Sequence, residues 1–157
     1  MPLCRAICSA LAATFLVALL TGLTGCASTP QASLERDDQA KQFGTAPAVA
    51  TVYVFRPDAS PDDSVLWLDG RLIGATLPRS YFRVHLDPGR HTLAGMAADN
   101  GRFMIDVRPG EVYFVQITLS GQQSVFQSLP TETGRKAVIN CCSLMENWAP
   151  GQRPLLR

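Results

Sequence analysis

Three side chains that alternate along one short segment carry the chemistry of a binding surface. Tyr81, Arg83 and His85 occupy every second position of "YFRVHL" (81–86). Because successive side chains of a strand point to opposite faces, these three share one face and the apolar residues between them share the other. Tyrosine and arginine are enriched in binding hot spots, and histidine changes charge at about pH 6.5. We therefore predict a candidate binding face here; the alternatives are an ordinary polar sheet face and a face covered by the C-terminal helix.

The two histidines of the chain, His85 and His91, lie on either side of a Pro88–Gly89 turn. A hairpin that pairs Leu86 with His91 puts the apolar residues of both strands on one face. In that register the histidines point to opposite faces and cannot share a metal ion. A three-residue turn would pair His85 with His91, but it would bury Arg83 or expose apolar residues. The sequence therefore predicts no metal site, and it places His91 partly buried under the turn.

Other residues that could do chemistry give weaker signals. Asp58, Asp62 and Asp63 form an acidic loop whose spacing differs from the EF-hand pattern, so we interpret it as solvated, with a weak calcium site as the alternative. The sequence has no Gly-x-Ser-x-Gly motif and no glycine-rich phosphate loop ahead of a helix. We predict no catalytic residue and no cofactor; a hydrolase or metalloenzyme with an unrecognised site is the alternative.

A hydrophobic segment at the N-terminus stops at a cysteine. Arg5 precedes an apolar run that ends at Leu20, which is the layout of a secretory signal. The run is shorter than the ~20 residues that a membrane-spanning helix needs. An aliphatic residue, two small residues and a cysteine follow, in "LTGC" (Leu23–Cys26), which resembles the bacterial lipobox. The thiol of Cys26 is a nucleophile that can accept a diacylglycerol, and cleavage before it would remove residues 1–25 as a signal peptide.

Lipidation would anchor the protein to a membrane rather than thread it through one. The lipobox resemblance implies about three acyl chains, palmitate among them, on Cys26, and each buried CH₂ group contributes ~0.8 kcal/mol. Ala27 stands where an aspartate favours retention in the inner membrane of bacterial lipoproteins. The resemblance therefore implies the outer membrane, with the folded domain in the periplasm.

The charge balance argues against a nucleic-acid partner. The chain has 14 Lys and Arg residues against 13 Asp and Glu residues, and one of the bases, Arg5, lies in the signal. A nucleic-acid-binding protein would carry a basic surplus. We therefore predict no nucleic-acid partner.

The last two of the five cysteines, Cys141 and Cys142, are neighbours. Adjacent Cα atoms lie about 3.8 Å apart, below the usual range for a disulfide, so we expect no bridge between them. We interpret them as two small buried residues on a helix, with an intermolecular disulfide as the alternative.

Turn signals divide the middle of the chain into eight short segments typical of strands. The expected strands are 49–55, 65–68, 71–75, 81–86, 91–98, 102–107, 112–120 and 124–129. Asp69–Gly70 is a strong hairpin signal. Pairing Ala97 with Phe103 would place Gly101 at the end of a three-residue turn, and we expect positive φ there and at Gly89. The spacing predicts a mainly β protein, an antiparallel β-sandwich of about seven to eight strands.

The segments on either side of the strands differ in character. A helical spacing of Val138, Cys141, Cys142 and Met145 predicts a C-terminal amphipathic helix that packs on the sheets. The polar stretch before the strands predicts a tether with a short helix in "ASLERDDQAKQF" (32–43), and Phe43 as its apolar contact. The predicted divisions are a signal peptide at 1–25, a lipidated N-terminus and tether at 26–48, a β-sandwich domain at 49–148 and a loose tail at 149–157.

Five stretches together carry a family resemblance. They are "AKQF" (40–43), "TVYVFRP" (51–57), "WLDGRLIG" (67–74), "LDPGRHTL" (86–93) and "RPGEVYFVQI" (108–117). The chain is similar to a widespread family of bacterial lipoproteins whose shared domain has no assigned function, and to envelope sandwich repeats rich in Asp-Gly and Pro-Gly turns. The resemblance implies a β-sandwich without catalytic residues. We predict a lipid-anchored accessory or binding module of the cell envelope, with an envelope protein or a glycan as its partner.

Overall fold

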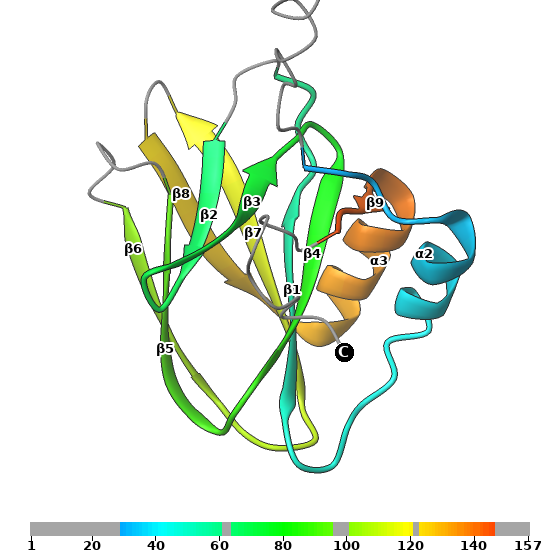
Figure 1. Cartoon of the computed structure of the whole chain (residues 1–157), viewed down its shortest axis with the longest axis vertical. Helices are drawn as coiled ribbons and strands as arrows, with labels where there is room; N and C mark the ends of the chain where they lie inside the picture. The colour runs from blue at the N-terminus through cyan, green and yellow to red at the C-terminus, as the bar shows by residue number, and fades with distance from the viewer. Residues whose placement is uncertain (1–28, 61–63, 96–100, 121–122, 147–157) are drawn as a thin grey trace, which may run out of the picture.

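Nine strands in two sheets and two helices make up the described part of the chain (Figure 1). This computed structural model describes residues 29–60, 64–95, 101–120 and 123–146. The predicted signal peptide, Cys26 and the tail at 149–157 lie outside the described residues. No helix within the described ranges has the length and apolar character that crossing a bilayer requires.

The larger sheet has the strand order β8-β7-β1-β4-β9. Its strands are β1 (Ala50–Arg56), β4 (Ser80–Leu86), β7 (Val112–Ser120), β8 (Gln123–Leu129) and β9 (Ser143–Leu144). The pairs β1–β4 and β7–β8 are antiparallel, whereas β1–β7 and β4–β9 are parallel. The expectation of a purely antiparallel fold is therefore wrong. β1 and β7 meet only after the chain has passed through the other sheet, so no hairpin joins them.

The smaller sheet has the order β3-β2-β5-β6 and is antiparallel throughout. Its strands are β2 (Ser64–Leu68), β3 (Arg71–Thr76), β5 (Gly89–Ala94) and β6 (Arg102–Val107). The predicted Asp69–Gly70 hairpin is confirmed, because Leu68 pairs with Arg71 across a two-residue loop. Asp69 and Gly70 both have positive φ, at 49° and 75°, as the favoured two-residue hairpin turn requires.

The expected hairpin between β4 and β5 is wrong, because these strands belong to different sheets. Gly89, with φ of 132°, is where the chain enters the smaller sheet, and its predicted positive φ is confirmed. β5 and β6 do pair, but Phe103 faces Leu93 rather than Ala97. The register differs by four residues, an even number, so each side chain keeps its predicted face.

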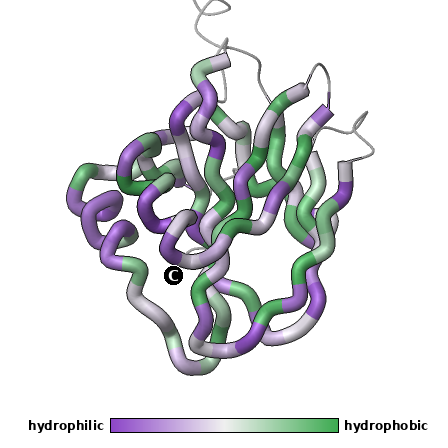
Figure 2. Tube along the Cα trace, turned by 180° about the vertical axis from the view of Figure 1, so that it is seen from behind, coloured by the Kyte–Doolittle hydropathy of each residue, from purple (hydrophilic) through white to green (hydrophobic). Residues whose placement is uncertain are grey.

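A first apolar core draws residues from both sheets. Alternate positions of the strands supply it, and Figure 2 shows hydrophobic and hydrophilic positions interspersed along them. Its buried members are Ala50, Val52, Val54, Leu66, Leu68, Ile73, Phe82, Val84, Leu86, Leu93, Ile105, Val107, Val115 and Met145.

A second apolar core lies between the larger sheet and the two helices, α2 (Leu34–Ala40) and α3 (Thr131–Cys141). All seven residues of β1 are buried, because this central strand has apolar layers on both faces. The buried members of the second core are Ala32, Ala40, Phe43, Tyr53, Phe55, Tyr81, Phe114, Val138, Cys142 and Leu144.

The segment predicted as a tether is largely part of the folded domain. The short helix is present as α2, and the Ser33 side chain caps it by accepting a hydrogen bond from the Arg36 N–H. Phe43 is buried as predicted, but Ala32 and Ala40 are buried with it. The Ala32 N–H also donates to the Leu144 carbonyl at 2.9 Å. Residues of the predicted tether therefore pack on the folded domain ahead of the predicted boundary at residue 49.

The C-terminal helix is shorter than expected, because α3 ends at Cys141 and β9 follows. A disulfide joins Cys141 to Cys142, so the expectation of two unbridged cysteines is wrong. Neighbouring side chains diverge on a helix, and the two sulfur atoms meet here because Cys142 leaves the helix in an extended conformation. Met145, predicted on the helix, is buried beyond its end.

Candidate functional site

The strand alternation predicted for the binding face is confirmed, but the face is not open at Tyr81. The Tyr81 side chain is fully buried in the second core, where α2 lies over it. Its hydroxyl donates to Oδ1 of Asp37 at 2.8 Å. Burial, followed by the hydrogen bond and the negative charge of Asp37, raises the pKa of Tyr81. The expectation that Tyr81 belongs to an exposed binding face is therefore wrong.

Arg83 and His85, the other two members of the predicted face, are half-buried on the same side of β4. Nδ1 of His85 lies 3.2 Å from Oγ1 of Thr51, its partner in the β1–β4 register. Burial, and then the positive charge of Arg83, lower the pKa of His85. The charge change expected of His85 is therefore displaced to lower pH.

His91 does not pair with His85. Its ring instead connects two turns, those of Asp69 and Asp87. Its Nδ1 lies 2.6 Å from Oδ2 of Asp69, and its Nε2 lies 2.8 Å from the Asp87 carbonyl oxygen. Burial opposes the charged form of His91, but hydrogen bonding and attraction to Asp69 outweigh it, so the pKa of His91 is raised. The pKa of Asp69 is lowered, because hydrogen bonds from His91 and the Thr92 N–H outweigh its desolvation. The partly buried position predicted for His91 is confirmed.

A buried carboxylate that sequence reasoning passed over, Asp37, connects three elements. It accepts hydrogen bonds from the Tyr81 hydroxyl, from the Leu144 N–H at 2.8 Å and from Nζ of Lys41 at 2.7 Å. Desolvation acts against its ionisation, but these donors outweigh it and lower the pKa of Asp37. Asp37 thus fastens α2 to β4 and β9, and each of its two carboxylate oxygens has a hydrogen-bond partner.

A buried arginine, Arg56, organises the loop that contains the predicted acidic residues. Its Nε donates to Oδ1 of Asp58 at 3.0 Å, and its other nitrogens donate to the carbonyls of Thr76 and Ser60 at 2.8 and 2.6 Å. Asp58 therefore has a structural partner, while Asp62 and Asp63 lie outside the described residues. Among the residues that the structure describes, no group of three His, Cys, Asp or Glu residues could hold a metal ion.

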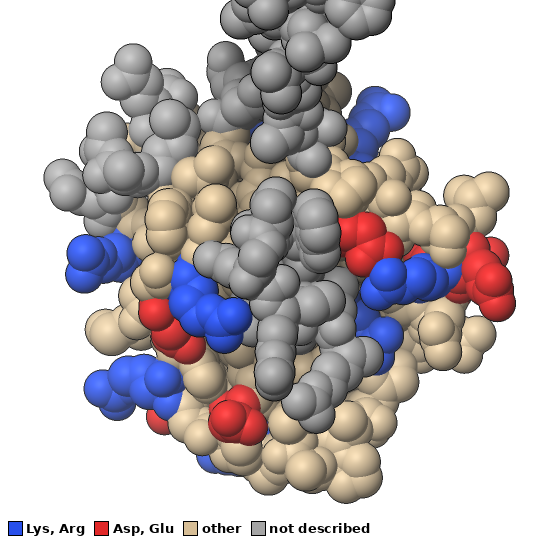
Figure 3. Space-filling view, viewed as in Figure 1, with Lys and Arg blue, Asp and Glu red and all other residues tan. Residues whose placement is uncertain are grey.

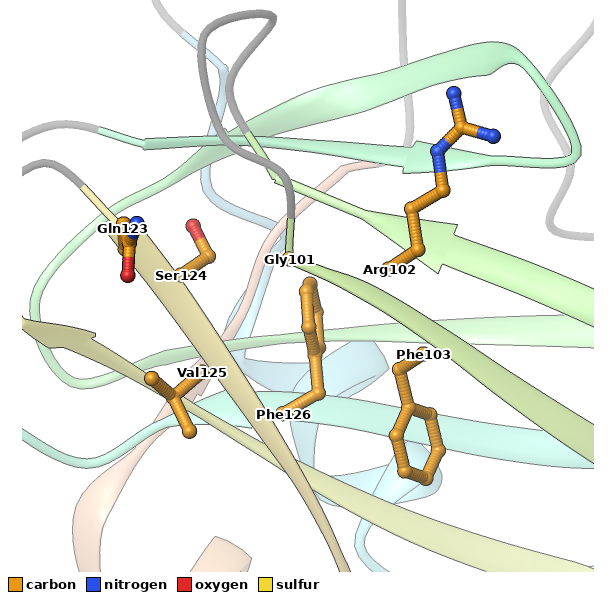
Figure 4. A pocket seen from close by; sticks show the side chains of 7 residues that line it. All are labelled: Gly101, Arg102, Phe103, Gln123, Ser124, Val125 and Phe126. Carbon is orange, nitrogen blue, oxygen red and sulfur yellow. The ribbon is translucent and has the colours of Figure 1, made fainter.

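A pocket of about 330 Å³ opens between the edge strands of the two sheets. Its lining comes from the start of β6 and the start of β8: Gly101, Arg102, Phe103, Gln123, Ser124, Val125 and Phe126. In Figure 4 the Phe126 ring extends toward Gly101, whereas the Arg102 guanidinium points away from that ring. The rings of Phe103 and Phe126 are 6.3 Å apart between centroids and inclined by 27°.

The chemistry of this pocket suits recognition of an apolar group. Its volume is at the lower end of the range for ligand sites, and its walls combine aromatic rings with a few polar groups. Ser124 is buried, and its hydroxyl lies 2.9 Å from that of Ser64, so it contributes to the wall. Sequence reasoning missed this site, because Phe103 and Phe126 come from different sheets and no motif connects them.

Charges of both signs are interspersed over the described part of the face in Figure 3. Several acids and bases pair with one another, such as Arg36 with Glu146.

Comparisons of the chain with protein-family models, with characterised proteins and with solved structures found no match. The resemblance to bacterial lipoproteins therefore stays a prediction from the sequence.

Proposed function

We propose that this chain is a lipid-anchored, non-catalytic binding module of the cell envelope. Its anchor would be Cys26, at the outer membrane, with the folded domain in the periplasm and an envelope protein or glycan as its partner. "LTGC" supports the anchor, since each position has the residue type that lipidation and cleavage need. The observation that carries the binding role is the pocket between Phe103 and Phe126.

The roles of the titratable residues also favour binding over catalysis. Asp37, Arg56 and the His91–Asp69 pair each hold separate segments together. A general base has to reach a substrate proton, whereas these groups are occupied by structural hydrogen bonds. The architecture that we propose for the module is a β-sandwich formed by the two sheets around the first core. Helix α3 would be an amphipathic helix that packs Gly134 and Val138 against the larger sheet, in the second core.

The anchor is tested by substituting its cysteine in intact cells. We expect Cys26→Ala to abolish palmitate labelling and to leave an uncleaved precursor in the inner membrane. Cys8→Ala, which removes another cysteine of the predicted signal, is the matched control and should be processed normally. Normal labelling and outer-membrane fractionation of Cys26→Ala would overturn the proposed anchor.

The binding role is tested by a photo-crosslinking residue at Val125, which lines the pocket and is 52% exposed. The control is the same residue at Leu34 on α2, which is 78% exposed. We expect a defined partner to be captured from cells at position 125 and not at position 34. Equal capture at both positions, or none, would contradict a binding site at this pocket.

A further inference from the structure

The four outer edges of the two sheets differ in how they are protected. An exposed edge strand is a template for pairing with another chain, and proteins block such edges with shortness, bulges, charges or covering segments. β9 has only two residues, and the Gln31–Met145 bridge lies next to it. β3 bulges where the register shifts opposite Leu66 and Trp67, and the Ala75 N–H donates to the Thr29 hydroxyl at 2.7 Å. β6 places Arg102 and Asp106 on its exposed side.

The fourth edge, β8, has none of these devices among the described residues. Its sequence, "QSVFQSL" (Gln123–Leu129), has no charged residue, no proline and no glycine. It pairs with β7 along all seven residues, and within the described chain β7 is its only strand partner. Val125 stands exposed on it, and the pocket opens along its first residues.

These features specify how a partner would bind. A strand added to an open edge gains main-chain hydrogen bonds, while a pocket for alternate side chains gives it specificity. Every second side chain of a strand beside β8 would point into the gap between the sheets, where Phe103 and Phe126 line the pocket (Figure 4). Arg102 is the one charged residue of the described lining.

We propose that an extended peptide of a partner protein binds by adding a strand to β8, with an apolar side chain in the pocket and an acidic residue beside Arg102. This inference rests on the proposed binding function and gives its mode. Charge favours such a peptide over a second copy of the chain, because the uncharged β8 of a second copy would bring no counter-charge to Arg102.

The test uses the full chain in detergent and a fluorescent synthetic hexapeptide, Thr-Val-Thr-Glu-Thr-Val, whose valines and glutamate fall on the same face of a strand. We expect binding, with slower hydrogen exchange of the β8 amides and unchanged exchange in β3. Val125→Lys adds the charge that natural edges use to block pairing, and we expect it to raise the Kd about tenfold. Thr118→Lys is the matched control, because Thr118 is exposed directly opposite Val125 on β7, one strand away from the edge.

Two further arms separate the steps of the proposal. Replacing the glutamate of the peptide by proline should abolish binding. Replacing the same glutamate by lysine should weaken binding to the native chain, but it should not weaken binding to the Arg102→Glu variant. Arg71→Glu, on the edge strand β3, controls for a general charge effect. Thermal unfolding checks that the variants are folded.

Three outcomes would overturn strand addition. One is equal binding by Val125→Lys and Thr118→Lys, and another is no protection of the β8 amides. The third is a dimer that Val125→Lys dissociates, since a second copy would then be the occupant. After any of these three outcomes, the crosslinking experiment decides what remains. If position 125 still captures a partner in cells, only strand addition is wrong and the proposed function stands. If position 125 captures no partner, the proposed function is wrong as well.

Discussion

Asp37 on α2 accepts a hydrogen bond from the Tyr81 hydroxyl on β4 at 2.8 Å, in the layer between the helices and the larger sheet. The same carboxylate holds the Leu144 N–H of β9. One buried group therefore positions an N-terminal helix and a C-terminal strand on the strand that was predicted to carry a binding face.

Removing the Tyr81 hydroxyl should destabilise the domain. We expect Tyr81→Phe to lower the free energy of unfolding by about 1–3 kcal/mol, because a buried charged acceptor loses its partner. Tyr113→Phe is the control, since the Tyr113 hydroxyl binds Glu111 at the surface, and its cost should be smaller. Chemical denaturation measures both, and equal effects would contradict a structural role specific to Tyr81.

Adding one methyl group to α3 should force it away from the sheet. A Cβ atom at Gly134 would overlap the Phe114 ring, so we expect Gly134→Ala to cost about 1–3 kcal/mol despite the better helix propensity of alanine. Thr133→Ala, on the exposed side of α3, is the control. Thermal unfolding should also show partial rescue when Phe114→Leu is combined with Gly134→Ala. A stabilised Gly134→Ala variant would contradict the close approach of α3.

Stability should depend on pH through the His91–Asp69 pair. The pKa of His91 is raised from 6.5 in the folded state. The contribution of His91 to the free energy of unfolding is therefore complete below pH 6.5 and disappears as the pH rises through the folded-state pKa. The pKa of Asp69 is lowered from 3.8, so its contribution is complete above that value and disappears as the pH falls through its folded-state pKa. The pair therefore stabilises most between these two values.

Asp69→Asn tests this pH dependence. Asparagine also tolerates the positive φ of Asp69, so the change removes mainly the charge. We expect the variant to lose under about 1 kcal/mol, because the pair is partly exposed, and to lose more at about pH 5.5 than at about pH 8.5. Unfolding in urea at both pH values measures this, with Asp106→Asn as the control. A loss independent of pH would contradict the ion pair.

Substituting Gly89 should destabilise the domain because of its backbone conformation, although no neighbouring atom would contact the new side chain. A Cβ atom there would meet nothing within 4 Å, but its φ of 132° is a conformation that essentially only glycine adopts. We expect Gly89→Ala to cost about 1–3 kcal/mol in unfolding free energy. Gly44→Ala, at a position equally open and without positive φ, should be nearly neutral. Similar melting temperatures for the two variants would contradict this.

Local patterns predicted the elements well and their assembly less well. Each of the eight expected strands is present, as are the Asp69–Gly70 turn and the helix after Ser33, because turn residues, alternation and caps act over a few positions. Alternation fixes which face a side chain takes but not which sheet its strand joins. For this reason β4 and β5 were wrongly paired, and the β5–β6 register was displaced by an even number of residues.

The candidate site required contacts that no local pattern encodes. The pocket depends on the distance between β6 and β8, which is set by how the sheets pack. The covering of Tyr81 had a usable signal, because the nearly continuous apolar run of β1 is typical of a strand buried on both faces. Asp37 and Arg56 were overlooked because isolated charged residues are ordinarily exposed.

If Cys26 is acylated as we propose, the position of Thr29 would also set how far the domain stands from the membrane. The Thr29 hydroxyl already binds the Ala75 N–H of β3, three residues after the proposed acylated Cys26. Three extended residues span about 10 Å at most. The domain would therefore lie directly on the lipid headgroups, with this end of β3 facing them. A partner would have to bind it close to the membrane surface.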